Sequence, residues 1–220
     1  MKHALFLPPF GELSDPTVLM QVAAAAEQNG WDGLFLWDHI LRPPSEPQQI
    51  ADVWIALAAI ATTTRTMRIG PMVTPTIQPR PQKLAREAVT LDWLSRGRLT
   101  SGLGLGVDAS GELSKFNELV DPIRRGDALD EAADLLVRLW TGETVNFQGD
   151  YYQAIACDSC PGPSRRPEYR SGWRHGARPS GRFDEPPAMT ACSLSRSGST
   201  GWSAGPLSSR PSAGIVKDST

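Results

Sequence analysis

The chain has 220 residues, an apolar fraction of 40% and a formal net charge of −2, a composition typical of a soluble globular protein. This charge gives no sign of nucleic-acid binding, and no apolar run reaches the ~18 residues that a membrane span needs. The N-terminal stretch MKHALFLPPF has too short an apolar core for a signal peptide. Three cysteines give no even disulfide framework, so we expect a cytoplasmic protein.

Apolar runs and helical patterns alternate through residues 1–156, as expected for repeated strand–helix units. Buried strands are predicted near residues 3–7, 32–37, 67–73 and 98–104. Helices are predicted within residues 14–31, 51–64, 81–95 and 121–142, and a short hairpin over roughly 145–153. Asp-Pro pairs mark two of the helix starts, because Asp caps free amide groups and Pro suits the first helical position.

Successive β/α units predict a parallel sheet, either in a (β/α)8 barrel or in an open doubly wound fold. A doubly wound nucleotide-binding domain usually carries G-x-G-x-x-G after its first strand, but PPFGEL stands there in this chain. Glycines occur instead at positions 102, 104 and 106, where we expect them to let a bulky ligand approach the fourth strand. We therefore favour an incomplete (β/α)8 TIM barrel of about four units.

Four segments of this part resemble the luciferase-like flavin-dependent monooxygenases: GWDGLFLWDHI, GPMVTP, KLAREAVTLDWLSRGRLTSGLGLG and LWTGETVNFQGDYYQ. The resemblance covers residues 2–155, and the branch resembled most includes enzymes that use a deazaflavin coenzyme. It implies a (β/α)8 barrel that binds FMN or coenzyme F420 at the C-terminal ends of its strands. It also implies an oxidoreductase or monooxygenase that acts on a small organic substrate, in a family that is often homo-oligomeric.

Asp38 and His39 directly follow the second predicted strand, at the rim where barrel enzymes carry out their chemistry. The resemblance implies that Asp38 accepts a hydrogen bond from the cofactor and that His39 is the general acid or base. Imidazole suits this task because it changes its charge near neutral pH. The alternative without a catalytic role is that Asp38 caps the following turn and His39 is a solvated loop residue.

Further candidate cofactor contacts lie at the ends of the next two strands. Thr74 and Thr76 end the third strand, where relatives place a backbone bulge under the flavin ring. Alternatively, these threonines only mark a strand end before a Pro-rich loop. The fourth strand ends with Gly104, Gly106 and Asp108.

A C-x-x-C sequence is formed by Cys157 and Cys160. No second pair follows it at the spacing of a zinc site, so we expect no metal.

Residues 157–220 differ from residues 1–156 in amino-acid composition and charge. Ser, Gly and Pro make up 29 of these 64 residues, and only 4 are Leu, Ile or Val. The segment carries a net charge of +4, whereas residues 1–156 carry −6. We therefore expect a folded half-barrel over 1–156 and a disordered Ser/Gly/Pro/Arg-rich tail over 157–220.

The tail also has a second explanation, which is out-of-frame translation. The codons possible for Glu168 to Arg174, read two bases later, allow Val-Pro-Val-Trp-Val-Ala. This sequence is close to the fifth strand of the resembled family, so we expect a frame change around residues 153–167 that truncates the barrel. The alternative to an enzyme is then a non-catalytic barrel remnant, because relatives bind the cofactor phosphate through the second half.

Overall fold

Strands and helices alternate along the part of the chain that the computed structural model describes, residues 2–46, 49–76 and 80–158. The strands are β1 (Ala4–Leu7), β2 (Gly33–Leu36), β3 (Arg68–Pro71), β4 (Thr74–Pro75), β5 (Leu103–Gly104), β6 (Thr144–Gln148) and β7 (Gln153–Asp158). The α-helices are α1 (Pro16–Gln28), α2 (Val53–Thr63), α3 (Pro81–Leu94) and α4 (Pro122–Leu139). This order confirms the predicted strand–helix alternation.

Three of the helices begin with an aspartate that accepts a hydrogen bond from a backbone amide of the first turn. The acceptors are Asp15 for α1, Asp52 for α2 and Asp121 for α4. Proline stands at the start of α1, α3 and α4, where its missing amide proton removes no helical hydrogen bond. The sequence therefore fixes these helix starts locally, before any packing is considered.

The strands are parallel, as predicted. β1 pairs with β2 and β2 pairs with β3, so that Ala4, Gly33 and Arg68 lie side by side across the sheet. The predicted fourth strand pairs with the third over much of its length, through a bridge between Ile69 and Leu99 and through the β4–β5 pair. The peptide bond between Met72 and Val73 is cis and lies between β3 and β4.

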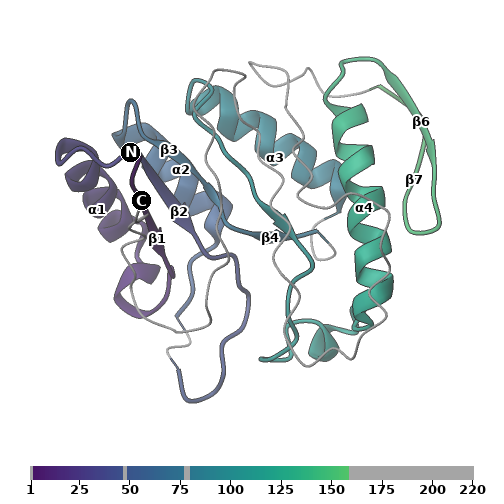
Figure 1. The fold of residues 1–220 in the computed structure, drawn as a ribbon, viewed down its shortest axis with the longest axis horizontal. Helices are drawn as coiled ribbons and strands as arrows, with labels where there is room; N and C mark the ends of the chain where they lie inside the picture. The colour runs from purple at the N-terminus through teal and green to yellow at the C-terminus, as the bar shows by residue number, and fades with distance from the viewer. Residues whose placement is uncertain (1, 47–48, 77–79, 159–220) are drawn as a thin grey trace, which may run out of the picture.

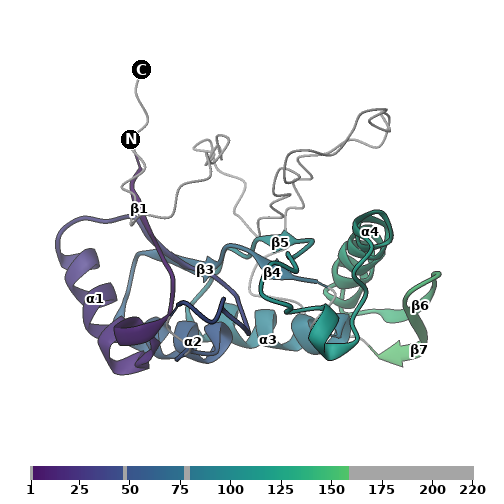
Figure 2. The ribbon, with the colours of Figure 1, turned by 90° about the horizontal axis from the view of Figure 1, so that it is seen from below.

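The helices α1, α2 and α3 cover one face of the parallel strands, as Figure 1 and Figure 2 show from two directions. The core lies between these layers. Leu34 and Leu36 of β2 are fully buried there, together with Leu57 and Ile60 of α2. None of the helices among the described residues is long and apolar enough to cross a membrane.

Two glycines of the fourth strand lie against the side chain of Val73. A Cβ atom at Gly104 would stand 2.5 Å from Val73 Cγ2, and one at Gly102 would stand 2.8 Å from Val73 Cγ1. Contacts of that length do not fit a side chain, so these two positions need glycine to make room for Val73. Val73 of the chain itself is therefore a close neighbour of Gly102 and Gly104, and the approach of a bulky ligand that we expected there stays a prediction.

The predicted hairpin is confirmed as the antiparallel pair β6–β7, which lies beside α4 in Figure 1. Glu131 of α4 holds its turn by accepting hydrogen bonds from the amides of Asp150 (2.8 Å) and Tyr151 (2.9 Å). The second strand continues to Asp158, so Cys157 belongs to the hairpin and not to the expected tail. The rest of that tail, with Cys160, lies outside the described residues.

Candidate active site

Asp38 and Thr74 meet where β2 and β4 reach the C-terminal rim of the sheet. Asp38 is partly buried and follows β2 by two residues, whereas Thr74 is fully buried in β4. Thr74 Oγ1 donates a hydrogen bond of 2.6 Å to Asp38 Oδ2. The structure therefore brings together two of the predicted site residues.

Burial raises the pKa of Asp38 to about 6, and the negative charge of Asp52 adds to this effect. The hydrogen bond from Thr74 opposes the shift, because it stabilises the ionised carboxylate. A carboxyl group with this pKa is present in both protonation states near neutral pH. Asp38 can thus accept or donate a hydrogen bond toward a ligand at the rim.

His39 binds a buried carboxylate that the sequence did not suggest. Its Nδ1 lies 2.9 Å from Glu112 Oε1, across 73 positions of the chain. Glu112 is only 2% exposed, and its Oε1 also accepts hydrogen bonds from the amides of Ile40 (3.1 Å) and Leu41 (3.0 Å). Burial alone would raise the pKa of Glu112, but these hydrogen bonds hold it below its ordinary value. Glu112 is therefore ionised near neutral pH.

An ionised carboxylate only accepts hydrogen bonds, so Glu112 places the proton of neutral His39 on Nδ1. The other ring nitrogen, Nε2, then carries a lone pair. Nε2 makes no hydrogen bond with the described residues, and the His39 side chain is 21% exposed. This is the arrangement of a general base whose second nitrogen is oriented by an acid. His39 lies in a loop and is partly exposed, but its Nδ1 is bound to Glu112, which the alternative of a solvated loop residue did not include.

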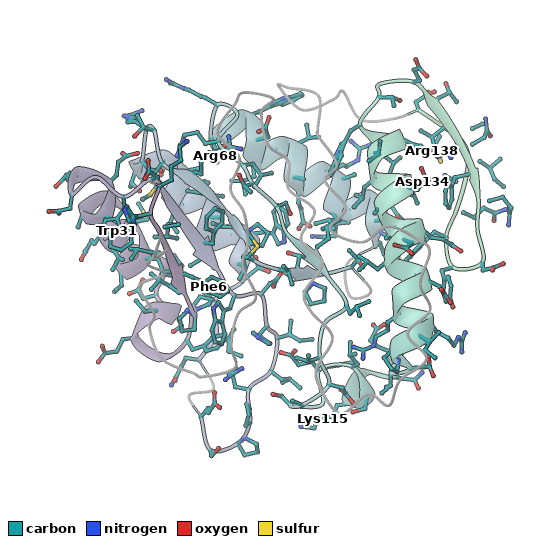
Figure 3. All side chains as sticks on the ribbon, viewed as in Figure 1. Phe6, Trp31, Arg68, Lys115, Asp134 and Arg138 are labelled. Atoms are coloured by element: carbon teal, nitrogen blue, oxygen red, sulfur yellow. The ribbon has the colours of Figure 1, made fainter. Side chains whose placement is uncertain are left out.

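Aromatic rings surround His39 and limit how its imidazole can turn. The ring centres of Phe10 and Trp37 lie 5.9 and 6.0 Å from that of His39. Phe6 of β1, labelled in Figure 3, continues this cluster at 5.5 Å from Trp37. The guanidinium of Arg42 lies over Phe10, 4.7 Å from its ring centre. The imidazole thus contacts Glu112 through one nitrogen and has two aromatic rings, of Phe10 and Trp37, beside it.

Glu112 was missed because the sequence gives no signal that selects it. It lies in the loop between β5 and α4, which also contains Asp108, Glu118 and Asp121. Parallel strands bring such a loop to the same rim as His39, so an acidic partner from this loop could have been suspected. Spacing along the chain does not tell which of the four acids reaches the imidazole.

Within the described part of the chain, no hydrogen bond joins the other predicted residues to Asp38 or His39. Thr76 Oγ1 at the end of β4 is buried and, among the described residues, has no hydrogen-bond partner. Asp108 uses Oδ1 within its own loop, accepting from the amides of Leu113 (2.8 Å) and Ser114 (3.0 Å). Gly106 has a φ of +71°, which favours glycine. Within the described part of the chain, no cluster of three or more His, Cys, Asp or Glu side chains could hold a metal ion.

A family model described as luciferase-like monooxygenase matches residues 2–192. The chain belongs to this family. The match confirms the expected resemblance and extends past residue 155, into the segment expected to be a tail. Family membership also confirms the class of oxidoreductase at the level of the family, whose named relatives are dehydrogenases and monooxygenases.

Among the curated relatives, an F420-dependent glucose-6-phosphate dehydrogenase from Amycolatopsis mediterranei is 33% identical over 142 residues, covering 64% of this chain and 42% of that protein. The corresponding enzyme from Intrasporangium calvum is 35% identical over 147 residues, with 63% and 42% covered. The chain thus spans less than half the length of the relatives it matches.

Solved structures with the same fold include an F420-dependent secondary alcohol dehydrogenase in complex with an F420-acetone adduct. It has a TM-score of 0.66 and 25% identity, over 75% of this chain and 50% of that one. The monooxygenase RslO1 from Streptomyces bottropensis has a TM-score of 0.65 at 22% identity, over 76% and 51%.

Proposed function

We propose that this chain is part of an F420-dependent oxidoreductase in which His39 moves a proton at an oxygen atom of a small organic substrate. The observation that carries the proposal is the contact between His39 Nδ1 and the buried Glu112, at 2.9 Å, which leaves Nε2 available. F420 is favoured over FMN because the curated relatives are named as F420-dependent. Two neighbours solved with FMN or modified FMN, a 3,6-diketocamphane monooxygenase and a riboflavin lyase, are only 22% and 17% identical.

The residues at the rim fit a flat heteroaromatic ring with hydrogen-bonding edges. Asp38 can donate or accept at neutral pH because its pKa is raised to about 6. Thr76 offers a buried hydroxyl that has no partner among the described residues. We propose that Asp38, Thr74 and Thr76, with the backbone near Gly104 and Gly106, contact the deazaflavin. When bound, such a cofactor accepts or donates a hydride.

The chain's own part in the reaction is proton transfer. If the substrate is an alcohol, Nε2 of His39 takes the hydroxyl proton while the carbon gives up its hydride. The imidazolium that forms carries a positive charge next to Glu112, which stabilises it. In the reverse direction the same Nε2 returns the proton to the carbonyl oxygen. Asp38 and Glu112 thus have different tasks, one toward the ring and one toward the base.

We also propose that the described part is the first half of a (β/α)8 barrel, in a cytoplasmic and homo-oligomeric enzyme family. Its four β/α units and the 42% coverage of the relatives support this proposal. A frame change near residues 153–167 would explain the composition of residues 157–220. The nucleotide sequence around codon 155 tests it, because the second reading frame should encode Pro-Val-Trp-Val-Ala.

The second candidate function is a non-catalytic remnant, favoured by the same 42% coverage.

A chain with the restored frame should oxidise an alcohol with F420 as acceptor, and His39→Ala should lower its turnover by roughly 10²–10⁴-fold. His3→Ala is the matched control, since His3 precedes β1 and contacts Trp31. Equal turnover of His39→Ala and His3→Ala would disprove the role of His39. If only the restored chain binds F420, the 220-residue chain is the remnant.

A further inference from the structure

The pairing of His39 with Glu112 depends on the loop that carries Glu112. This loop, residues 105–121, connects β5 to α4 and has no α-helix or β-strand of its own. The side chain of Glu112 extends from this loop to His39 and to the amides of Ile40 and Leu41, which follow β2. A long loop keeps such a contact only where other residues hold its backbone in place.

The beginning of the loop is held by Arg125 of α4. Arg125 is 9% exposed, and its Nη1 donates to the carbonyl oxygens of Leu105 (3.2 Å) and Gly106 (2.9 Å). Its Nε is buried without a hydrogen-bond partner among the described residues. Arg98, by contrast, uses Nε, Nη1 and Nη2 in hydrogen bonds. The hydrogen bonds of Arg125 are thus concentrated on the two residues that follow β5.

The middle of the loop is held by Asp108. Its Oδ1 accepts from the amides of Leu113 and Ser114, and its carbonyl oxygen accepts from the amide of Gly111 (3.0 Å). These bonds close a turn that ends directly beside Glu112. Hydrogen bonds from the Ser114 and Leu113 amides hold the pKa of Asp108 below its ordinary value, so the carboxylate stays ionised and acts only as an acceptor.

We propose that Arg125 and Asp108 are positioning residues that hold Glu112 against His39, Arg125 from the start of the loop and Asp108 from its turn. Asp108 then acts through Glu112 and not through the cofactor contact expected from the sequence. The catalytic meaning of this arrangement rests on the proposed function of His39. The positioning itself does not, so it can be tested without any turnover.

The test is amide hydrogen exchange of Ile40 and Leu41 in the full 220-residue chain, followed by NMR or mass spectrometry. Both amides donate to Glu112, so their exchange reports whether Glu112 is in place. Glu112→Ala gives the exchange rate of these two amides when their hydrogen bonds to Glu112 are completely lost. Arg125→Met and Asp108→Ala should speed this exchange by about 10-fold or more, as expected for lost hydrogen bonds to a carboxylate.

Conservative variants give matched controls. Asp108→Asn keeps an Oδ1 acceptor for Leu113 and Ser114, and Arg125→Lys keeps a donor for the two carbonyl oxygens. Both should stay within about 3-fold of wild type. The amides of Thr66 and Met67, which Glu27 binds elsewhere in the molecule, should not change in any of these variants.

Unchanged exchange at Ile40 and Leu41 in both Arg125→Met and Asp108→Ala, with fast exchange in Glu112→Ala, would overturn the proposal. If Arg125→Met unfolds the chain, the Asp108 pair decides alone. Fast exchange in Asp108→Ala with slow exchange in Asp108→Asn supports positioning, and equal exchange in the two contradicts it. A chain that exchanges as proposed but shows no turnover after frame restoration would refute the proposed function only.

Discussion

The two ends of the parallel strands use their polar groups in opposite ways. At the amino-terminal end, marked by Arg68 in Figure 3, Glu27 of α1 accepts hydrogen bonds from the amides of Arg65, Thr66 and Met67. Buried Arg98 donates from Nε, Nη1 and Nη2 to backbone and hydroxyl oxygens in the same region. The polar groups at this end are satisfied by the chain itself.

At the carboxyl-terminal end, near Lys115 in Figure 3, the chain leaves polar groups available. Thr76 Oγ1 and Trp37 Nε1 are buried without partners among the described residues, and Asp38 has a raised pKa. Unsatisfied and shifted groups lower stability, and they are typical of sites that bind ligands. The amino-terminal end of the strands therefore stabilises the fold, and the carboxyl-terminal end holds the candidate active site, as in barrel enzymes.

Removing Arg98 should have the largest effect on the stabilising end. Arg98→Met leaves the carbonyl oxygens of Ala61 and Met67 buried without their donor and should lower the free energy of unfolding by about 3–4 kcal/mol. Arg138→Met is the matched control, because Arg138 is exposed, with Asp134 on the same helix and the ring of Phe147 as its side-chain neighbours. Its loss should lower the free energy of unfolding far less than the loss of Arg98. Urea unfolding measures both values. Similar decreases in the free energy of unfolding of the two variants would show that Arg98 does not have a special role in stability.

The next largest effect should come from Glu27, whose pKa is about 2. Burial alone would raise this pKa, but hydrogen bonds from the amides of Thr66, Met67 and Arg65 outweigh it. A lowered carboxyl pKa adds stability above the ordinary value of 4.5, and this stability is lost as the pH falls toward 2. Glu27→Gln should therefore cost about 1–2 kcal/mol at pH 7, discounted for partial exposure.

In urea unfolding, the difference between Glu27→Gln and wild type should shrink as the pH falls from 4.5 toward 2. Glu143→Gln, at an exposed position after α4, is the control and should match wild type at every pH. A constant difference across this pH range would show that the contribution of Glu27 does not depend on its charge.

At the carboxyl-terminal end of the strands, the pH dependence of stability should have the opposite sign. Because burial raises the pKa of Asp38 to about 6, the native state binds the proton more tightly than the unfolded chain does. The associated stability is present below the ordinary value of 3.8 and is lost as the pH rises through 6. Asp38→Asn removes the charge and keeps an oxygen for Thr74. It should raise the free energy of unfolding by about 1 kcal/mol at pH 7.

The gain from Asp38→Asn should shrink toward zero as the pH falls below 3.8, where the carboxyl group becomes protonated in both the folded and the unfolded state. At pH 7 Asp38→Asn should stabilise the fold, whereas Glu27→Gln should destabilise it. A variant that is less stable than wild type at pH 7 would mean that the Asp38 carboxylate stabilises the fold. The rim would then resemble the other end of the strands.

Most of the fold could be predicted from the sequence because its signals are local. Apolar runs marked the strands, and the capping aspartates and prolines marked the helix starts. At the break between β3 and β4, only the resemblance implied an irregular backbone, and the contact of Val73 with Gly102 and Gly104 was not predicted. Contacts of this kind join residues far apart in the chain and leave no periodic pattern.

Only the site residues that come directly after a predicted strand could be predicted from the sequence. Asp38, His39 and Thr74 follow buried strands, so their place at the rim could be inferred from the chain order. Glu112 could not be inferred, because its loop offers several acids and the choice among them depends on tertiary structure. The loop contacts of Asp108 were hidden for the same reason, and a cofactor role was expected instead.

The tautomer of His39 tests the central claim that the rim presents an imidazole whose Nε2 is available for proton transfer. Nitrogen-15 NMR of the chain labelled at its 3 histidines can assign it, with His39→Gln identifying the signal. At a pH where the ring is neutral, we predict a protonated Nδ1 and an unprotonated Nε2. Glu112→Ala should remove this preference. A proton on Nε2 in the wild type, or the same tautomer in Glu112→Ala, would contradict the account.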